Sequence, residues 1–339
     1  MTEQLISVRE FATEHFNLDP DRVTALAGAG SDRQYFRLIF PVCKVIGTWS
    51  ENTKENEAFF YLADTLHAGG VAVPRIIAVD RSRSIYLQED CGSYDAYSLL
   101  AGQDYKIQKP WLKKIIDRLV HLQLEGSRYV DYLRCYPSAQ FGYSDVLHDL
   151  HYFERYFLGY TDIPYDRKKL WDDFGSIALR VEKCRFKGFM YRDFQSRNIM
   201  IDGETIYFID FQGARRGPCV YDLISLLYQA RLGLRLGERK EMEDYYISRI
   251  SSEKNLDGET LRDDLNAVLP VRLLQVLGAY GRRGLMERKS HFISSISPAI
   301  DNLALLTDEN AFVNNHSELS PLLQQIIESK EKILCLING

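Results

Sequence analysis

The spacing of hydrophobic residues changes near residue 90 and divides the chain into two parts. In the first part, apolar side chains recur at helical spacing over residues 3–16, which predicts an amphipathic helix. Residues 35–40 instead alternate with a period of two, which predicts a strand. Residues 42–48 are expected to form its partner strand.

A second helix and two further strands complete the predicted first part. Asn52 or Thr53 can cap this helix with a side-chain oxygen, and Gly69 with Gly70 ends it. The two further strands are expected at residues 71–79 and 85–88. The first ninety residues are therefore predicted to form a small sheet with one inserted helix.

Helical patterns dominate after Asp90, and one hairpin interrupts them. Asp202-Gly203 stands between two apolar runs within residues 199–209, a strong hairpin signal because both central residues must tolerate positive φ. The expected fold class is α+β, with a small antiparallel-sheet lobe over residues 1–90 and a mostly helical lobe over 91–339. The predicted helices cover residues 111–124, 145–157, 170–184, 220–232, 261–285 and 321–336.

Composition and charge narrow the possible partners. The 339 residues are 45% hydrophobic and 26% charged, as in folded globular proteins, and the net charge of -5 gives no global attraction for nucleic acid or an anionic membrane. No stretch approaches the ~18 apolar residues of a membrane helix, and the N-terminus lacks the apolar run of a signal peptide. The six cysteines lie far apart without a CxxC pair, which indicates reduced packing residues in a cytoplasmic protein.

Three polar residues around the hairpin carry the candidate chemistry. Asp193 and Asn198 lie five residues apart in a loop, and the first hairpin strand begins after Asn198. Because a hairpin brings its ends together, Asp210 is expected to return near Asn198. Phosphoryl transfer needs one carboxylate at the acceptor hydroxyl, while an amide oxygen and a second carboxylate can hold Mg²⁺. The spacing matches the D-x-x-x-x-N and D-F-G elements of kinases.

Longer segments resemble the aminoglycoside phosphotransferase/choline kinase family, a branch of the protein-kinase-like fold. They are GAGSDRQYFRL at 28–38, YRDFQSRNIMI at 191–201 and IDFQGARRGPCVYDLISLL at 209–227. Among family members, the chain most resembles the bacterial anomeric kinases of N-acetylmuramate and N-acetylglucosamine, to which LLQVLGAYGRRGL at 273–285 is also similar. The resemblance covers nearly the whole chain. It implies a bilobal kinase-like fold, ATP and Mg²⁺ as cofactors, and a sugar as the small-molecule acceptor.

The resemblance also implies roles for individual residues. Asp193 looks like the catalytic base, and Asp222 matches a family aspartate that braces the catalytic loop. Asn198 and Asp210 look like the metal ligands. The nucleotide-binding residues implied are Gly28, Gly30 and Ser31 in a turn over the phosphates, and Gln88, Glu89 and Cys91 where the family links its lobes and holds adenine.

The chain departs from the family pattern at two places. Tyr191 stands where a histidine is usual, at a position that generally supports the loop rather than reacts. The strand lysine that pairs with the α- and β-phosphates is not clearly present, because its position falls near Gly47 and Lys44 is offset by three residues. An odd offset turns a strand side chain to the opposite sheet face. Glu57 on the following helix is the natural candidate for the carboxylate partner of such a lysine, and with no lysine to pair it could be a solvated surface residue.

Two alternatives stay open. The acceptor could be an aminoglycoside, choline, homoserine or a fructosamine, and acidic residues such as Asp145, Asp149 and Glu154 could then pair with a cationic substrate. The chain could also be a pseudokinase-like module that binds a nucleotide or sugar without transferring phosphate. The absent lysine favours that second alternative, and the set of Asp193, Asn198 and Asp210 opposes it.

Overall fold

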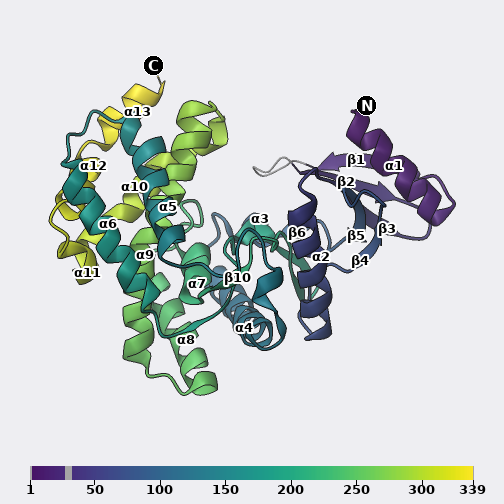
Figure 1. Cartoon of the computed structure of the whole chain (residues 1–339), viewed down its shortest axis with the longest axis horizontal. Coiled ribbons are helices and arrows are strands. Elements are labelled where there is room, and N and C mark those ends of the chain that lie inside the picture. Colours follow the sequence, from purple (N-terminus) through teal and green to yellow (C-terminus); the bar gives the residue numbers. More distant parts are fainter. Residues whose placement is uncertain (1, 27–32, 339) are drawn as a thin grey trace. The chain divides into compact units, whose positions relative to one another are not determined.

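The computed structural model describes residues 2–26 and 33–338 (Figure 1). Gly28, Gly30 and Ser31 of the predicted phosphate-binding turn lie outside the described residues. The chain folds into two compact units, each continuous in space but not in sequence. Unit 1 contains Met1–Leu99, His121–Ala139 and Ser196–Arg215, and unit 2 contains Leu100–Val120, Gln140–Gln195 and Arg216–Gly339. The division into lobes at residues 1–90 and 91–339 stays a prediction.

A five-stranded antiparallel sheet forms the centre of unit 1. Its strand order is β1-β2-β3-β5-β4. The strands are β1 (Arg22–Leu26), β2 (Gln34–Ile39), β3 (Lys44–Trp49), β4 (Ile76–Val79) and β5 (Ile85–Glu89). Helices α1 (Glu3–Phe16) and α2 (Thr53–Ala68) pack against the sheet (Figure 1).

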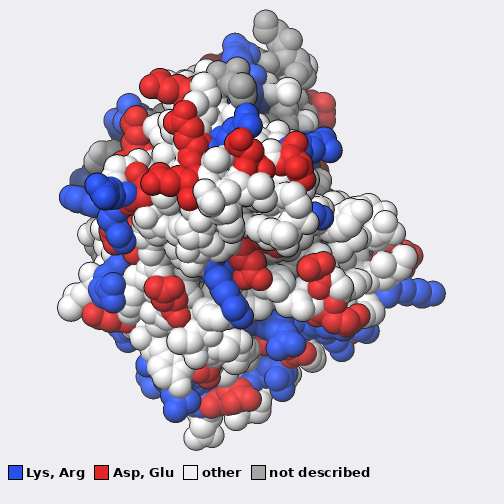
Figure 2. Space-filling view, turned by 90° about the vertical axis from the view of Figure 1, so that its right-hand side faces the viewer, with Lys and Arg blue, Asp and Glu red and all other residues white. Residues whose placement is uncertain are grey.

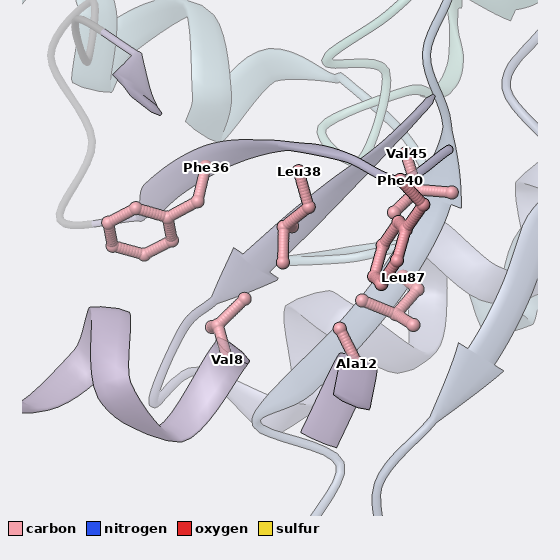
Figure 3. Packing of buried hydrophobic residues seen from close by; sticks show 7 residues of the cluster. All are labelled: Val8, Ala12, Phe36, Leu38, Phe40, Val45 and Leu87. Carbon is pink, nitrogen blue, oxygen red and sulfur yellow. The ribbon is translucent and has the colours of Figure 1, made fainter. Parts of the chain in front are cut away.

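Helix α1 covers one face of the sheet through a compact apolar cluster. Val8 and Ala12 of α1 are completely buried, and they point at apolar side chains of the strands (Figure 3). The strand members of this cluster are Phe36, Leu38, Phe40, Val45 and Leu87. Burial of such side chains is the main favourable term in folding, so this cluster fixes α1 on the sheet.

Gly47 of β3 lies on the same face as this cluster, because it is paired with Phe36 on one side and with Leu87 on the other. A Cβ at position 47 would lie 2.3 Å from Cγ1 of Val8 and 2.9 Å from Cδ1 of Leu38. These distances leave no room for a side chain. Thr48, the next residue, therefore points to the opposite face, which α2 covers.

The predicted hairpin is confirmed, with its turn one residue later than expected. Strands β8 (Ile199–Asp202) and β9 (Thr205–Phe208) pair in antiparallel register with Asp202 opposite Thr205. The two central residues are thus Gly203 and Glu204, and Gly203 has φ +59. Positive φ at the first central position is what a type II′ turn requires of its glycine. The short strand β6 (Tyr94–Asp95) adds to the other edge of β8.

Unit 2 is mostly helical and also contains a two-stranded sheet of β7 (Lys187–Met190) and β10 (Arg215–Pro218), whose first residue, Arg215, is counted with unit 1. Helix α4 (Tyr105–Tyr129) belongs to unit 2 up to Val120 and to unit 1 beyond it. Helices α5 and α9 pack against each other, and α6, α7 and α10 also pack on α9. The other helices are α3 (Ala96–Leu100), α5 (Tyr143–Tyr156), α6 (Arg167–Glu182), α7 (Val220–Leu227), α8 (Leu236–Lys254), α9 (Gly258–Tyr280), α10 (Ser290–Glu309), α11 (Ala311–Asn314), α12 (Leu319–Glu328) and α13 (Lys330–Asn338).

Several predicted boundaries were wrong in informative ways. The predicted strand over 71–79 is regular only from Ile76, because residues 71–75 run without a strand partner. The predicted helix over 261–285 ends at Tyr280 and continues as a π-helical turn, Gly281–Met286. The predicted helix over 321–336 is interrupted at Ser329, which caps α12. The α+β class itself is confirmed.

The surface carries charges of both signs side by side. On the face shown in Figure 2, Lys and Arg side chains are interspersed with Asp and Glu side chains. Among the described helices, none combines the length and the apolar character needed to cross a bilayer.

We expect Gly47→Ala to destabilise the protein by about 1–3 kcal/mol, because the added methyl group overpacks the contact between α1 and β3. Chemical denaturation measures this loss. Gly237→Ala is the control, since a Cβ there meets no atom within 4 Å. Equal stability of the two variants would contradict the assignment of Gly47 to the α1 face.

Candidate active site

Asn198 and Asp210 are brought together at the open end of the hairpin. The N–H of Ile209 donates to the carbonyl oxygen of Asn198 at 3.0 Å, so Asp210 directly follows a residue bonded to Asn198. The side chain of Asp210 accepts from Nε2 of Gln212 at 2.9 Å and from the hydroxyl of Tyr35 at 3.5 Å. The predicted proximity of Asn198 and Asp210 in unit 1 is therefore found.

The backbone of Asp210 is held in an unusual conformation. Its φ of +67 lies in the left-handed region, which costs a non-glycine residue about 1–3 kcal/mol. The surrounding packing maintains it, because the ring of Phe211 stacks on Phe59 of α2 at 4.9 Å between centroids. Residues kept in such conformations cluster at functional sites, which supports a specific task for this carboxylate.

The phenol of Tyr35 is a hydrogen-bond donor in this cluster. Burial, and then the negative charge of Asp210, raise its pKa well above the usual value for tyrosine. Burial likewise raises the pKa of Tyr86, on the neighbouring strand β5, to about 12. Both hydroxyls thus stay protonated at neutral pH, and the carboxylate of Asp210 receives a donor rather than a second negative charge.

The donor set at Asn198 and Asp210 fits Mg²⁺. This ion prefers oxygen ligands, and it is usually bound by one or two carboxylates together with substrate phosphates and waters. One amide oxygen and one carboxylate at the end of a hairpin match that pattern. Among the described residues, no group of three or more His, Cys, Asp and Glu side chains could hold a metal ion alone.

Gln88, Glu89 and Cys91 lie at the end of β5 and in the segment after it. Gln88 is buried, and its Oε1 has no hydrogen-bond partner among the described residues. The N–H of Glu89 donates to the carbonyl oxygen of Arg75 at 2.9 Å. Burial, then the carboxylates of Glu89, Asp90 and Asp202, raise the pKa of the Cys91 thiol, so Cys91 stays protonated and contributes packing.

The segment on either side of Cys91 is anchored to the sheet. Arg37 of β2 holds Asp90 with two contacts, 2.7 Å from Nε to Oδ2 and 2.9 Å from Nη2 to Oδ1. The same Nη2 donates to the carbonyl oxygen of Gly92 at 2.6 Å. A bidentate pair of this kind fixes the direction of both side chains.

Asp193 lies in unit 2, in a loop that Asp222 of α7 holds. The carboxylate of Asp222 is completely buried and accepts from the N–H of Tyr191 at 2.9 Å and from that of Arg192 at 3.0 Å. Arg192 has φ +82, so the loop just before Asp193 is also in the left-handed region. The two hydrogen bonds to Asp222 stabilise this conformation, which agrees with the bracing role that the sequence predicts.

The side chain of Arg192 lies beneath the loop as a buried charge. Its guanidinium donates to Oδ1 of Asp149 at 2.8 Å and to the hydroxyl of Tyr221 at 2.6 Å. It also lies 4.7 Å from the ring centroid of Phe141. Burial acts to lower the pKa of Arg192, but Asp149, Tyr221 and Asp193 together raise it, so the group stays charged.

The carboxylate of Asp193 itself is half-exposed and faces a second buried arginine. Its side chain is 49% exposed, and Nη1 of Arg272 in α9 lies 3.7 Å from Oδ1. Arg272 is oriented by Gln275 at 2.7 Å. Burial acts to lower the pKa of Arg272, while Tyr221 and Asp193 raise it, so Asp193 keeps a cationic neighbour. An accessible carboxylate held in a fixed direction can accept a proton from a hydroxyl group.

Sequence reasoning missed Arg272 and Tyr35. A signal for Arg272 was available, because it interrupts the apolar run AVLPVRLL over 267–274. Such a charge inside a buried helix needs a partner. Tyr35 offered no comparable signal, since an aromatic residue is ordinary in a strand.

Two sequence predictions about the lysine position are corrected. Gly47 faces α1, so a side chain at 47 would point away from Asp210 rather than toward it. Lys44 shares the face of Thr48 but is exposed at the first position of β3. Glu57 does not meet a strand cation, because it pairs at the surface with Arg83, whose Nη2 lies 2.7 Å from Oε2.

These features define a class of protein. Unit 1 brings an amide and a carboxylate together at the end of a hairpin, and unit 2 carries a braced loop with an accessible aspartate, residue types that enzymes transferring phosphoryl groups use. A model of the phosphotransferase enzyme family matches residues 23–253, and the chain belongs to this family.

The sequence identity between this chain and individual relatives is low. The chain is 25% identical over 218 residues to the N-acetylmuramate/N-acetylglucosamine kinase of Neisseria meningitidis, a match that covers 62% of this chain and 63% of that protein. It is 24% identical over 255 residues to the kinase of the same name from Caulobacter vibrioides, covering 71% of this chain and 67% of the relative. The matched stretch thus spans about two thirds of each relative.

Solved structures agree on the fold. A thermostable mutant of the aminoglycoside phosphotransferase APH(4)-Ia superimposes with a TM-score of 0.58 at 13% identity, covering 87% of this chain and 98% of the other. The choline kinase LicA from Streptococcus pneumoniae also gives 0.58, at 14% identity and with 89% and 99% covered. The expected protein-kinase-like fold is confirmed.

We expect Asp222→Ala to destabilise the protein by about 2–6 kcal/mol, from about 1–3 kcal/mol for each buried N–H left without its acceptor. Thermal and chemical denaturation measure the loss. Asp222→Asn retains one acceptor oxygen and should lose less. If Asp222→Ala kept the stability of the native protein, the bracing role would be refuted.

Proposed function

We propose that this protein is an ATP-dependent kinase that transfers the γ-phosphate to a hydroxyl group of an amino sugar or a related cell-wall sugar. The observation that carries the proposal is the half-exposed carboxylate of Asp193, held beside the buried Arg272 in a loop braced by Asp222. A fixed and accessible carboxylate is what the acceptor side of phosphoryl transfer needs.

Asp193 acts on the acceptor. Its carboxylate accepts a hydrogen bond from the sugar hydroxyl, aims the oxygen at the γ-phosphorus, and takes the proton as the new O–P bond forms and the bond from the γ-phosphorus to the leaving ADP breaks. Arg272 keeps the carboxylate oriented through the contact between its Nη1 and Oδ1 of Asp193 at 3.7 Å. Arg192 pairs with Asp149 and thereby helps to hold the loop that carries Asp193 in place.

Asn198 and Asp210 act on the nucleotide through Mg²⁺. The ion supplies charge neutralisation at the phosphate oxygens when it is bound. Tyr35 and Gln212 hold the Asp210 carboxylate in one orientation, so the ligand is positioned before the nucleotide arrives. The backbone of residues 88–91 at the end of β5 is assigned to adenine.

The acidic residues that could have favoured a cationic acceptor are already engaged. Asp145 accepts from the N–H of Gly142 at the start of α5, and Asp149 pairs with Arg192. Glu154 accepts from Trp171 at 2.9 Å and from Arg167 at 2.8 Å. Since these carboxylates are committed to caps and ion pairs, an uncharged or acidic sugar suits unit 2 better than an aminoglycoside or choline. The names of the curated relatives support the same choice.

A cytoplasmic site of action fits this proposal. ATP is available there, and the described cysteines are free thiols, of which Cys91, Cys184 and Cys219 are buried.

An acceptor screen tests the proposed function. We expect N-acetylmuramate or N-acetylglucosamine, incubated with protein and MgATP, to gain one phosphate by mass spectrometry. Asp193→Asn should reduce turnover by about 100- to 10,000-fold and leave ATP affinity almost unchanged, because the side chain serves the acceptor. Asp172→Asn, an exposed aspartate of α6, is the control. Tight nucleotide binding without turnover on sugars, aminoglycosides or choline would instead support a binding module.

Removal of the metal ligand should have a different effect. Asp210→Ala is expected to abolish the dependence of ATP affinity on Mg²⁺, since the carboxylate links ion and protein. Calorimetric titration of ATP with Mg²⁺ and with EDTA measures this. Asp202→Ala, at the exposed turn of the same hairpin, should behave as the native protein. An unaltered Mg²⁺ requirement in Asp210→Ala would count against the assignment.

A further inference from the structure

Arg33 is a buried cation that the features described so far do not use. It directly precedes β2 and is 4% exposed. Its Nη2 lies 3.3 Å from Oε2 of Glu55 and 3.3 Å from Oδ1 of Asn56, both at the start of α2. Its Nε is buried without a hydrogen-bond partner among the described residues. A buried guanidinium with unsatisfied donors is costly unless a ligand or another function compensates.

Arg33 lies on the sheet face that carries Asp210. Thr48 pairs with Tyr35 and with Tyr86, so these three side chains share the face opposite Gly47. The hydroxyl of Tyr35 reaches Asp210. The guanidinium of Arg33 lies 5.8 Å from the ring centroid of Phe59, and that ring stacks on Phe211. Arg33, Glu55 and Asp210 therefore belong to one cluster between the sheet, α2 and the end of the hairpin.

The other cationic side chains on this sheet face either pair with other groups or lie far from the cluster around Asp210. Arg37 is bound to Asp90 and to the carbonyl of Gly92. Lys44 is exposed and lies four residues before Thr48 along β3, about 13 Å at ~3.3 Å per residue. Arg22, at the first position of β1, is also exposed, so of these cations Arg33 is the one with contacts to the cluster around Asp210.

The charge of Arg33 is maintained. Burial acts to lower its pKa, but Tyr86, Tyr35 and Glu55 raise it above the usual value. Glu55 is 24% exposed and its pKa is raised, by burial and by Asp210, although Arg33 lowers it. Arg33 therefore keeps its positive charge inside the cluster, and its Nε has no hydrogen-bond partner among the described residues.

We infer that Arg33, oriented by Glu55, binds the α- and β-phosphates of the nucleotide in place of the strand lysine that this chain lacks. The inference rests on the proposed ATP dependence. A guanidinium offers five donors in a planar fork that suits phosphate oxygens. Its contacts to Glu55 and Asn56, both 3.3 Å, are long beside the about 2.7–2.9 Å of charge-assisted hydrogen bonds, so phosphate oxygens can replace them with shorter ones.

The inferred pair differs from the predicted one on both sides. The cation comes from the segment before β2 instead of from β3, where Gly47 faces α1 and its position is filled by Val8 and Leu38. The carboxylate is Glu55, two residues before Glu57 and therefore on another side of α2. Glu57 serves at the surface with Arg83.

Calorimetry with three ligands tests the role of Arg33. For Arg33→Gln we expect the affinity for ATP and ADP to fall by about 10- to 100-fold, the loss of one or two charged hydrogen bonds, whereas adenosine, which has no phosphate, should bind as before. Arg33→Lys should retain part of the phosphate affinity because it keeps the charge. An equal loss for adenosine and ATP would mean that Arg33 only supports the fold, and would overturn the inference.

Variants of α2 supply the matched comparison. Glu55→Gln should weaken ATP and ADP several-fold without affecting adenosine, because it leaves Arg33 less firmly oriented. Glu57→Gln, on the same helix, should leave all three affinities unchanged. Thermal denaturation without nucleotide checks the folding of each variant, and Arg33→Lys with Glu55→Gln decides the question if Arg33→Gln does not fold. A loss of ATP affinity in Glu57→Gln but not in Glu55→Gln would refute the pair.

The native protein separates this inference from the proposed function. If it bound neither ATP nor ADP, the proposed kinase activity would fail and this inference with it. If it bound both nucleotides and Arg33→Gln bound them equally well, only the assignment of Arg33 would fail.

Discussion

One backbone hydrogen bond, from the N–H of Ile209 to the carbonyl of Asn198, brings together the two residues proposed to bind the metal. It closes the base of the hairpin, so Asn198, just before the first strand, and Asp210, just after the second, are held close together. The sheet and α2 then hold Asp210 from the other side, through the hydroxyl of Tyr35 and the stacking of Phe211 on Phe59. Local pairing brings the ligands together, and long-range packing fixes their direction.

The loop that carries Asp193, on the proposed acceptor side of the site, is also fixed in place by hydrogen bonds and ion pairs. Asp222 fixes the loop through two backbone donors, and Arg192 and Arg272 supply buried positive charge beneath it. The side chains proposed for each half of the reaction are therefore positioned by contacts within a single unit. Asp193 depends on contacts within unit 2, and Asp210 on contacts within unit 1. Such preorganisation reduces the rearrangement needed when substrates bind.

The sequence was most informative where a local rule decides the structure. An Asp-Gly pair between apolar runs was enough for the hairpin, and hence for the proximity of Asn198 and Asp210, although the turn lies at Gly203-Glu204. Family resemblance identified Asp222 correctly as the brace. The roles of Asp193, Asn198 and Asp210 in catalysis stay predictions.

The sequence was least informative about which side of an element faces the site. Spacing placed the missing lysine near Gly47, but only the pairing register and the position of Val8 show that this residue faces α1. The choice between Glu55 and Glu57 depends on where α2 packs, which a helical period does not give. Helix α8 was missed because its apolar residues form no clear stripe along the sequence.

The contacts of Arg37 with Asp90 and Gly92 fix the position of the segment that follows β5. They tie the segment assigned to adenine to strand β2, and residues as far as Leu99 remain part of the sheet unit. A purine-like inhibitor that contacts only the backbone of this proposed adenine site would therefore meet a segment whose position relative to β2 is fixed before it binds.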